Sequence, residues 1–308
     1  MIEYLYLGRV EYAEALRLQS ELVALRTEGR IGNVLLLLEH PPVLTLGRNA
    51  SRANILASDE LLTARGVTQH EINRGGDVTY HGPGQLIGYP IFDLRSLRNA
   101  KGGRLGPVDF VRLMEEALIR LCGEFGVRAE RICGLTGVWC GVSTTAETMA
   151  CGPEQQDSSK NPPPAGRGRK IAAIGIHVSR GVTSHGFAFN VTSDLNDFAL
   201  INPCGITDRA VTSLKRELEL EVEPESAREA AGAHLLPALE TLANQAARQF
   251  GSVLNEQVLA VESLDALRAR ARDVAEISAQ EFPAEDTPLE IPPELERLRG
   301  VKSRPVSA

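Results

Sequence analysis

The chain has 308 residues, of which 43% are hydrophobic, and a formal net charge of −7. This length and apolar content allow a full hydrophobic core in one large domain or two ordinary ones. No apolar run approaches the ~20 residues that cross a bilayer, and the start MIEYLYLGRVEYAEAL lacks the basic region and cleavage site of a signal peptide. We therefore expect a soluble, cytoplasmic protein.

The charge is uneven along the chain, because residues 1–215 are nearly neutral and the acidity lies in the C-terminal third. A nucleic-acid-binding protein would show a basic stripe or domain, so that class is not indicated. The five cysteines are odd in number and form no CxxC pair. This pattern suits neither a disulfide framework nor the usual zinc spacings, so we expect free thiols and no metal.

Helix and strand alternate in the first half of the chain. The helical spacing of apolar residues predicts helices over 11–26 and 108–126. In the second helix one face is expected to carry Val108, Leu113, Ala117, Leu121 and Phe125. Short apolar runs predict strands over 2–8, 34–40, 42–47, 86–94 and 137–142, the second and third of which flank a Pro-Pro turn.

Residues 143–169 are rich in Ser, Thr, Pro, Gly and Gln, a composition that predicts an exposed, disordered insertion. Order is expected to resume with paired strands, KIAAIGIHV and SHGFAFNV, and with a helix over 227–250 that Pro237 interrupts near an end or at a kink. We assign 1–254 to one catalytic domain that contains the insertion. The acidic extension 255–308 is expected to be part helical and part disordered.

Three segments far apart in the sequence are candidates for chemistry. The first, RGGDVTYHGPGQ, places flexible glycines beside Arg74, Tyr80 and His81. Such a glycine cluster marks either a simple hairpin turn or a surface that a ligand approaches closely.

The second segment opens with Lys170, and the third is NPCG around Cys204. Lys170 is either a solvated strand end or a cation drawn toward a partly desolvated site. Pro203 and Gly205 favour a loop on which the Cys204 thiol projects into a cleft, with backbone N–H groups near a developing oxyanion. The alternative for a single cysteine is a small buried hydrophobic residue.

The segments RGGDVTYHGPGQLIGYP, KIAAIGIHV, HGFAFNV and NPCGI, in this order, resemble the signature segments of the lipoyl(octanoyl) transferase family. The resemblance covers residues 2–253 approximately, apart from the insertion, and the final segment has no recognisable counterpart. It implies an α/β fold with a mixed, largely antiparallel sheet flanked by helices, similar to that of the biotin and lipoate protein ligases. The active site would lie in a groove above the sheet.

The resemblance also implies site residues. Cys204 would form an acyl-thioester intermediate, with Lys170 as its partner, while a direct role for His81 in the chemistry stays open against a scaffold role. The acyl-chain pocket would be formed by Arg74, Gly75, Gly76, Asp77, Val78, Thr79, Tyr80 and His81, by Ala173, Ile174 and Gly175, and by Gly186, Phe187 and Ala188. Gly82 and Gly84 are expected to help the acyl chain or thioester lie close to the backbone.

The activity that the resemblance implies is transfer of an octanoyl group from octanoyl-acyl carrier protein to a lysine of lipoyl domains in 2-oxoacid dehydrogenases and of the glycine cleavage H protein. No cofactor, nucleic acid or membrane is expected, and the protein is expected to be a monomer. A cation near a thiol of pKa ~8.5 favours the thiolate, which can attack a thioester without ATP.

Two alternatives stay open at this point. One is an ATP-dependent lipoate or biotin protein ligase, because these enzymes share the fold. The other is a non-catalytic module that binds acyl chains. Independence of ATP would separate the first from a transferase, and an octanoyl adduct on Cys204 would separate the second.

Overall fold

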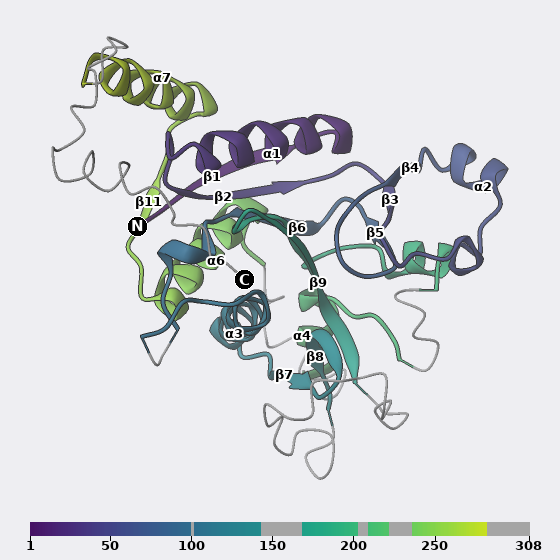
Figure 1. Ribbon diagram of the computed structural model, residues 1–308. Coiled ribbons are helices and arrows are strands. Elements are labelled where there is room, and N and C mark those ends of the chain that lie inside the picture. The colour runs from purple at the N-terminus through teal and green to yellow at the C-terminus, as the bar shows by residue number, and fades with distance from the viewer. Residues whose placement is uncertain (100–101, 143–167, 203–208, 222–235, 282–308) are drawn as a thin grey trace, which may run out of the picture.

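The computed structural model describes residues 1–99, 102–142, 168–202, 209–221 and 236–281. An eight-stranded sheet with the order β11-β1-β2-β6-β10-β9-β8-β7 forms its centre (Figure 1). The strands are β1 (Ile2–Arg9), β2 (Asn33–Glu39), β6 (Gln85–Ile91), β7 (Ala129–Ile132), β8 (Leu135–Cys140), β9 (Arg169–Ser179), β10 (Val182–Asn190) and β11 (Val258–Ala260). Strands β11 and β2 run parallel to β1, and the pairs from β2 to β7 are antiparallel. The predicted mixed, largely antiparallel sheet is confirmed.

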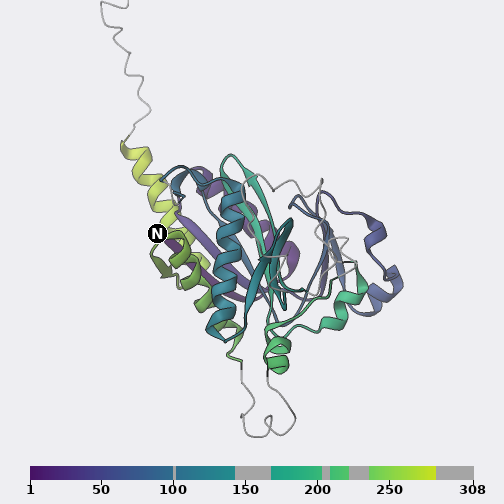
Figure 2. The same cartoon turned by 90° about the horizontal axis from the view of Figure 1, so that it is seen from below.

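Helices cover both faces of this sheet. Helix α1 (Tyr12–Thr27) lies on one face, and α3 (Pro107–Glu124) and α6 (Leu239–Leu254) lie on the other (Figures 1 and 2). Apolar and polar residues do not alternate in the β2 sequence VLLLLE because both faces of this strand are buried. Leu35 and Leu37 pack in the core beneath α3 and α6, whereas Leu36 and Leu38 pack in the core beneath α1. A strand buried on both faces reads as a continuous apolar run.

The described helices include several short ones, and none has the length and apolar character of a membrane span. The short ones are the 3-10 helices Arg52–Asn54, Leu94–Ser96 and Leu195–Leu200, together with α2 (Asp59–Ala64) and α4 (Leu214–Glu221), whereas α7 (Leu264–Glu281) has 18 residues. Pro237 lies just before α6, so the predicted interruption marks a helix start.

The buried face of α3 differs from the predicted one. Its residues Phe110, Met114, Ala117 and Leu121 are buried, whereas Val108 is 52% exposed. Ala117 and Leu121 are buried as predicted, and Leu113 and Phe125 pack partly buried against the same core. The prediction is wrong at Val108, in the first turn of the helix, and it missed Phe110 and Met114.

A second, three-stranded sheet was not predicted. It has the order β4-β3-β5, formed by β3 (Val43–Leu46), β4 (Thr68–Glu71) and β5 (Val78–His81), and it lies beside α2 at one end of the molecule (Figure 1). Leu44, Leu62, Tyr80 and Phe198 belong to its own apolar cluster. The glycine-rich motif therefore lies where this small sheet meets the large one.

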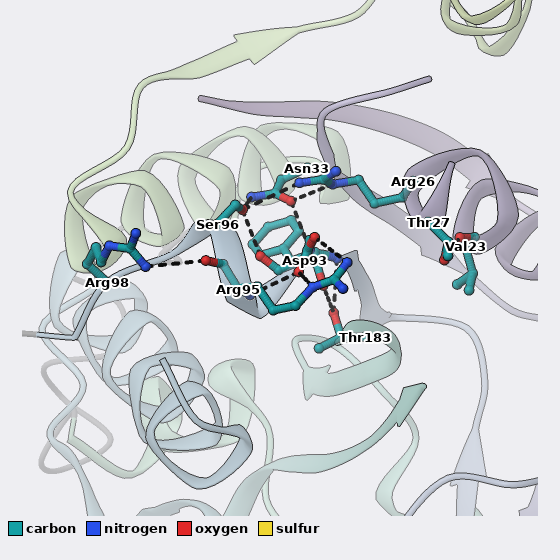
Figure 3. Close-up of polar contacts among 10 residues, drawn as sticks. Val23, Arg26, Thr27, Asn33, Asp93, Arg95, Ser96, Arg98 and Thr183 are labelled. Atoms are coloured by element: carbon teal, nitrogen blue, oxygen red, sulfur yellow. Dashed lines mark hydrogen bonds and ion pairs between the residues drawn. The ribbon is translucent and has the colours of Figure 1, made fainter. Parts of the chain in front are cut away.

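A polar cluster fastens the end of β6 to its neighbours (Figure 3). Asn33 Oδ1 accepts hydrogen bonds from Arg26 Nε at 3.0 Å and from the Asp93 backbone N–H at 2.9 Å. The Asp93 carboxylate accepts two bonds of 2.8 Å from Arg95, which lower the pKa of this carboxyl group. Thr183 on β10 adds bonds to the β6 backbone. One buried amide thus links α1, β2 and β6.

The beginning of the predicted C-terminal extension packs onto this fold. Strand β11 pairs with β1, and α7 places Leu267 and Ala271 in the α1 core. Arg268 also donates two bonds of 2.7 Å to Glu21 on α1. The domain boundary at 254 stays a prediction, and the part expected to be disordered lies mainly in 282–308, outside the described residues.

Most of the predicted insertion, residues 143–167, also lies outside the described part of the chain. Its last residue, Arg169, is the first residue of β9 and donates bonds of 2.8 and 2.7 Å to Glu217 on α4. The expectation that Arg169 belongs to an exposed insertion is therefore wrong, because an ion pair holds it against α4.

Replacing Asn33 with Ala should lower the free energy of unfolding by roughly 1–3 kcal/mol, because the Asp93 backbone N–H would lose its buried acceptor. Urea unfolding followed by circular dichroism measures this. Asn196→Ala, at an exposed position, is the matched control and should change the unfolding midpoint little. Equal midpoints for the two variants would contradict the role of the Asn33 cluster.

Candidate active site

A cavity of about 580 Å³ lies where the glycine-rich motif meets β9 and β10. Its walls combine segments that are about a hundred residues apart in the chain, because β9 and β10 form an antiparallel pair and the backbone of Gly75 bonds to Ile176 at 3.0 Å. Twelve of the predicted site residues line it: Arg74, Gly75, Gly76, Thr79, His81, Lys170, Ala173, Ile174, Gly175, Gly186, Phe187 and Ala188.

Arg74 anchors the motif at the edge of this cavity. Its side chain is 8% exposed, and it donates to Thr45 at 2.8 Å (backbone oxygen) and 3.0 Å (hydroxyl) and to the Gly75 carbonyl at 3.1 Å. Arg74 thereby fixes the 74–76 loop to β3 and places a permanent positive charge beside the cavity.

Some of the glycines serve chain packing. A Cβ on Gly175 would lie 2.8 Å from the Gly75 oxygen, so Gly175 lets the motif lie directly on β9. Gly82 and Gly84 do not belong to the cavity lining: a Cβ on the first would meet the Tyr80 hydroxyl at 2.4 Å, and one on the second would meet Thr192 at 2.6 Å. These two glycines allow close protein contacts, and their expected contact with the acyl chain has no support in this geometry.

Asp77, Val78 and Tyr80 likewise lie outside the cavity lining. Asp77 accepts hydrogen bonds from the backbone of Ser51 and of Val78 at 3.1 and 2.8 Å. Val78 is fully buried in the small-sheet cluster, and the Tyr80 hydroxyl donates to Asp197 at 2.6 Å. Alternation along β5 explains this, because Thr79 and His81 face the cavity and their neighbours face away.

Lys170 lies at the start of β9 and is 8% exposed. Its ammonium nitrogen lies 4.7 Å from the centre of the Trp139 ring, a cation–π contact. Gly137, with φ +128°, lies beside the lysine stem; a Cβ there would lie 2.6 Å from the Ala172 carbonyl oxygen and at an ordinary contact distance of 3.4 Å from Lys170 Cε. The strand start is thus a partly desolvated site that opens into the cavity.

Cys204 lies within 203–208, outside the described residues. The chain on either side is fixed. Before it, the Asn202 N–H donates to the Asn54 carbonyl at 2.7 Å, and after it the Ala210 carbonyl accepts from the Lys170 N–H at 2.9 Å. The segment that contains Cys204 therefore begins beside the small sheet and ends on the backbone of Lys170.

Residues 11–236 match the family model of the lipoyl protein ligase A/B catalytic domain. The chain belongs to this family. An octanoyltransferase of Acidobacterium capsulatum is 55% identical over 85% of this chain and 94% of its own length. One of Koribacter versatilis is 47% identical, over 89% and 92%.

Solved structures confirm the fold. A lipoate-protein ligase A bound with ATP aligns with a TM-score of 0.54 and 13% identity, over 90% of this chain and 95% of its own. A lipoate protein ligase from Thermoplasma acidophilum, solved with its E2 lipoyl domain, aligns with a TM-score of 0.52 and 14% identity, over 89% and 91%. At these identities the likeness concerns architecture alone.

Sequence reasoning missed several residues that line the cavity of this family member, among them Tyr12, Asn49, Tyr89 and His185. Tyr12 lies in the first turn of α1, outside the quoted signature segments, whereas Tyr89 of β6 lies within RGGDVTYHGPGQLIGYP but was not named as a site residue. His185 did carry a signal, because it directly precedes the predicted Gly186. Its φ of 56° is unusual for a residue with a side chain, and its Nε2 lies 2.7 Å from Asn73 Oδ1.

The histidines at this junction are buried and neutral. Burial lowers the pKa of His40 to about 4. Burial, and then the proximity of His40, lower the pKa of His81 to about 3. Burial and then the charge of Arg74 lower the pKa of His185 to about 4.

Lowering the pH should therefore begin to destabilise the protein near pH 6.5, a higher pH than that at which carboxylates titrate. Unfolded histidines take up protons below about pH 6.5 while these folded rings stay neutral, so stability is lost as the pH falls from about 6.5 to about 4. Each ring contributes up to ~1.4 kcal/mol per pH unit in that range. Urea unfolding at about pH 7, 6 and 5 measures the loss, and His40→Gln should make it shallower. A free energy of unfolding that is equal at these pH values would contradict the assignment.

Proposed function

We propose that this protein transfers an octanoyl group from octanoyl-acyl carrier protein to a lysine of lipoyl domains, the first step of endogenous protein lipoylation, through a thioester on Cys204. The observation that carries this proposal is a single cavity that joins Lys170 to the glycine-rich motif and to the two strand segments predicted for the acyl chain. Octanoyltransferases that are 55% and 47% identical to this chain over more than nine tenths of their own length support the same activity.

The apolar part of the cavity suits an acyl chain. Ala173, Ile174, Gly186, Phe187 and Ala188 supply small and apolar surface from two neighbouring strands. Polar groups gather near Arg74, His81 and Lys170. An unbranched chain bound along the strands would thus place its thioester end toward the charged residues, as ligand sites with few polar groups commonly do.

In the first half-reaction the Cys204 thiolate attacks the thioester carbonyl of the carrier-bound octanoyl group. The carbon–sulfur bond to the carrier breaks, and the carrier thiolate takes a proton from the Lys170 ammonium. The products are octanoyl-Cys204, the free carrier thiol and a neutral Lys170.

In the second half-reaction the neutral amine of the acceptor lysine attacks octanoyl-Cys204. Its surplus proton passes to Lys170 and the Cys204 thiolate leaves, which restores the starting pair. Conversion of a thioester to an amide is downhill, so the cycle balances without ATP. Cys204 and Lys170 are expected to titrate as a coupled pair.

The protein is proposed to work in the cytoplasm as a monomer, without a cofactor. A reducing compartment keeps a nucleophilic thiol available. Among the described residues Cys122, Cys133 and Cys140 are free thiols. The fold shared with lipoate protein ligases favours an ATP-dependent ligase as the second candidate, and octanoyl transfer in the absence of ATP is the discriminating measurement.

Cys204→Ala should abolish both the octanoyl adduct and transfer to a lipoyl domain, because the proposed thioester forms on this thiol. Intact-mass spectrometry after incubation with octanoyl-acyl carrier protein detects the adduct as a gain of one octanoyl group. Cys122→Ala, which removes a fully buried thiol from α3, is the matched control and should retain both activities. Full transfer by Cys204→Ala would refute the mechanism.

Lys170→Arg should lower the transfer rate ~100-fold or more, although it keeps the positive charge. A guanidinium does not give up its proton near neutral pH, and it would have to fit between Trp139 and Gly137. Single-turnover rates of adduct formation and of transfer measure the effect. A near-normal rate would mean that Lys170 acts only through its charge and that another group moves the proton.

A further inference from the structure

A continuous chain of buried hydrogen bonds runs from the glycine-rich motif to the segment that follows Cys204. His81 Nδ1 lies 2.8 Å from Gln85 Oε1, and Gln85 Nε2 donates to Asn190 Oδ1 at 2.8 Å. Asn190 Nδ2 then donates to the Thr212 carbonyl at 2.9 Å. His81, Gln85 and Asn190 are each less than a tenth exposed and lie on β5, β6 and β10.

The direction of this chain determines the protonation of His81. The Thr212 carbonyl can only accept, so Asn190 presents its NH₂ group to it and its oxygen to Gln85. Gln85 must then present its NH₂ group to Asn190 and its oxygen to His81. A carbonyl oxygen cannot donate, so the Nδ1 of His81 carries the proton and Nε2 of the neutral ring has a free lone pair.

At its far end this series of hydrogen bonds reaches the backbone of Lys170. The Thr212 N–H donates to the Lys170 carbonyl, and the Lys170 N–H donates to the Ala210 carbonyl, both at 2.9 Å. Asn190 therefore fixes the short segment that pairs with Lys170 and that follows Cys204 by only a few residues. A shift of Asn190 would move both ends of the chain.

The surroundings of His81 favour the neutral ring. On its Nε2 side the Thr45 hydroxyl oxygen accepts from Arg74 at 3.0 Å, so its O–H can donate to Nε2, but only over a long contact of 3.4 Å. The imidazole therefore keeps most of its accepting capacity toward the cavity, which it lines. The titratable and charged groups that face it from the neighbouring elements are Tyr12, His40, Arg74 and His185, and none of them is an anion that would stabilise an imidazolium.

We propose that Gln85 and Asn190 are positioning residues that hold His81 as a neutral hydrogen-bond acceptor for the N–H of the attacking acceptor amine. The inference rests on the proposed octanoyl transfer for the identity of this amine. An octanoyl chain has no N–H or O–H group, whereas the acceptor amine brings N–H bonds to the reacting carbon. An acceptor at His81 Nε2 would orient the amine so that its lone pair meets the acyl carbon, while its proton passes to Lys170.

The geometry assigns His81 to the second half-reaction, so that half-reaction is the one to perturb. Gln85→Glu keeps an oxygen that accepts from His81 Nδ1 and adds a carboxylate beside the ring, but it also removes the NH₂ group that donates to Asn190 Oδ1. The loss of that bond does not vary with pH, whereas the charge of the ring does. The carboxylate favours the imidazolium, whose Nε2 would donate and could no longer accept. The adduct on Cys204 should form at a near-normal rate, while its transfer to the lipoyl domain should fall ~10-fold or more near neutral pH.

The pH dependence separates this role from a general loss of structure. Transfer by Gln85→Glu should recover as the pH rises and the imidazolium loses its proton, whereas a purely structural defect would persist at every pH. Gln257→Glu adds the same charge at an exposed position and is the matched control with an unchanged profile. Equal slowing of both half-reactions, or a pH profile that matches the unmodified protein, would overturn the proposal.

A second measurement does not depend on an activity assay. In protein with ¹⁵N-labelled histidine, the ring nitrogens of the six histidines report which atom carries the proton, and His81→Gln assigns the relevant signals. His81 should show a protonated Nδ1 and an unprotonated Nε2 at neutral pH. A proton on Nε2 would overturn the inference even where octanoyl transfer is found, and failure of the adduct assay would reject the proposed function while leaving this tautomer intact.

Discussion

Every polar atom that is buried between strands needs a partner, and this constraint shapes the junction of the two sheets. An unpaired amide in this position would cost ~1–3 kcal/mol, which is a large part of the stability of a domain. Gln85 and Asn190 meet the constraint by bonding to each other and onward to His81 and Thr212. Because Gln85 on β6 bonds to His81 on β5 and also to Asn190, its paired residue on β10, these bonds join the three strands. The geometry of the cavity follows from this satisfied chain.

Close contacts with the backbone also determine the geometry of the cavity. Gly47 and Gly175 each leave space that a backbone oxygen of the motif occupies, since a Cβ on them would lie 2.4 Å from Gly76 O and 2.8 Å from Gly75 O. Gly88 does the same within the large sheet, where a Cβ would lie 2.1 Å from the Phe187 ring. The ring stacks on Phe250 of α6 and also lines the cavity. Gly88, which is outside the cavity lining, therefore helps decide where the cavity residue Phe187 lies.

The main elements could be predicted from the sequence because apolar residues recur at helical spacing, as in α3, or form nearly unbroken short runs, as in β2 and β9. The small sheet could not. Strand β4 consists of Thr68–Glu71, which are polar and mostly exposed, and α2 has only six residues. A signal for α2 was present in Ser58, whose hydroxyl accepts from the Leu61 N–H as an N-cap. Without this sheet, reasoning from the motif could not tell that Thr79 and His81 face the cavity while Tyr80 faces Phe198.

The residues of the site likewise include some that the sequence predicted and some that it did not. Lys170 and the glycine-rich motif were predictable because each lies in a contiguous segment with a recognisable pattern, whereas Tyr12 and Tyr89 reach the cavity only through the packing of α1 on β6. This difference has a chemical counterpart. Lys170, the described residue proposed to move protons, lies at a strand start against Trp139, and the cavity lining also carries buried histidines with lowered pKa values beside the charge of Arg74. Histidines with lowered pKa values compete little for a proton, which leaves Lys170 as the group proposed to exchange it. A neutral ring at His81 then suits orientation of the amine better than removal of its proton.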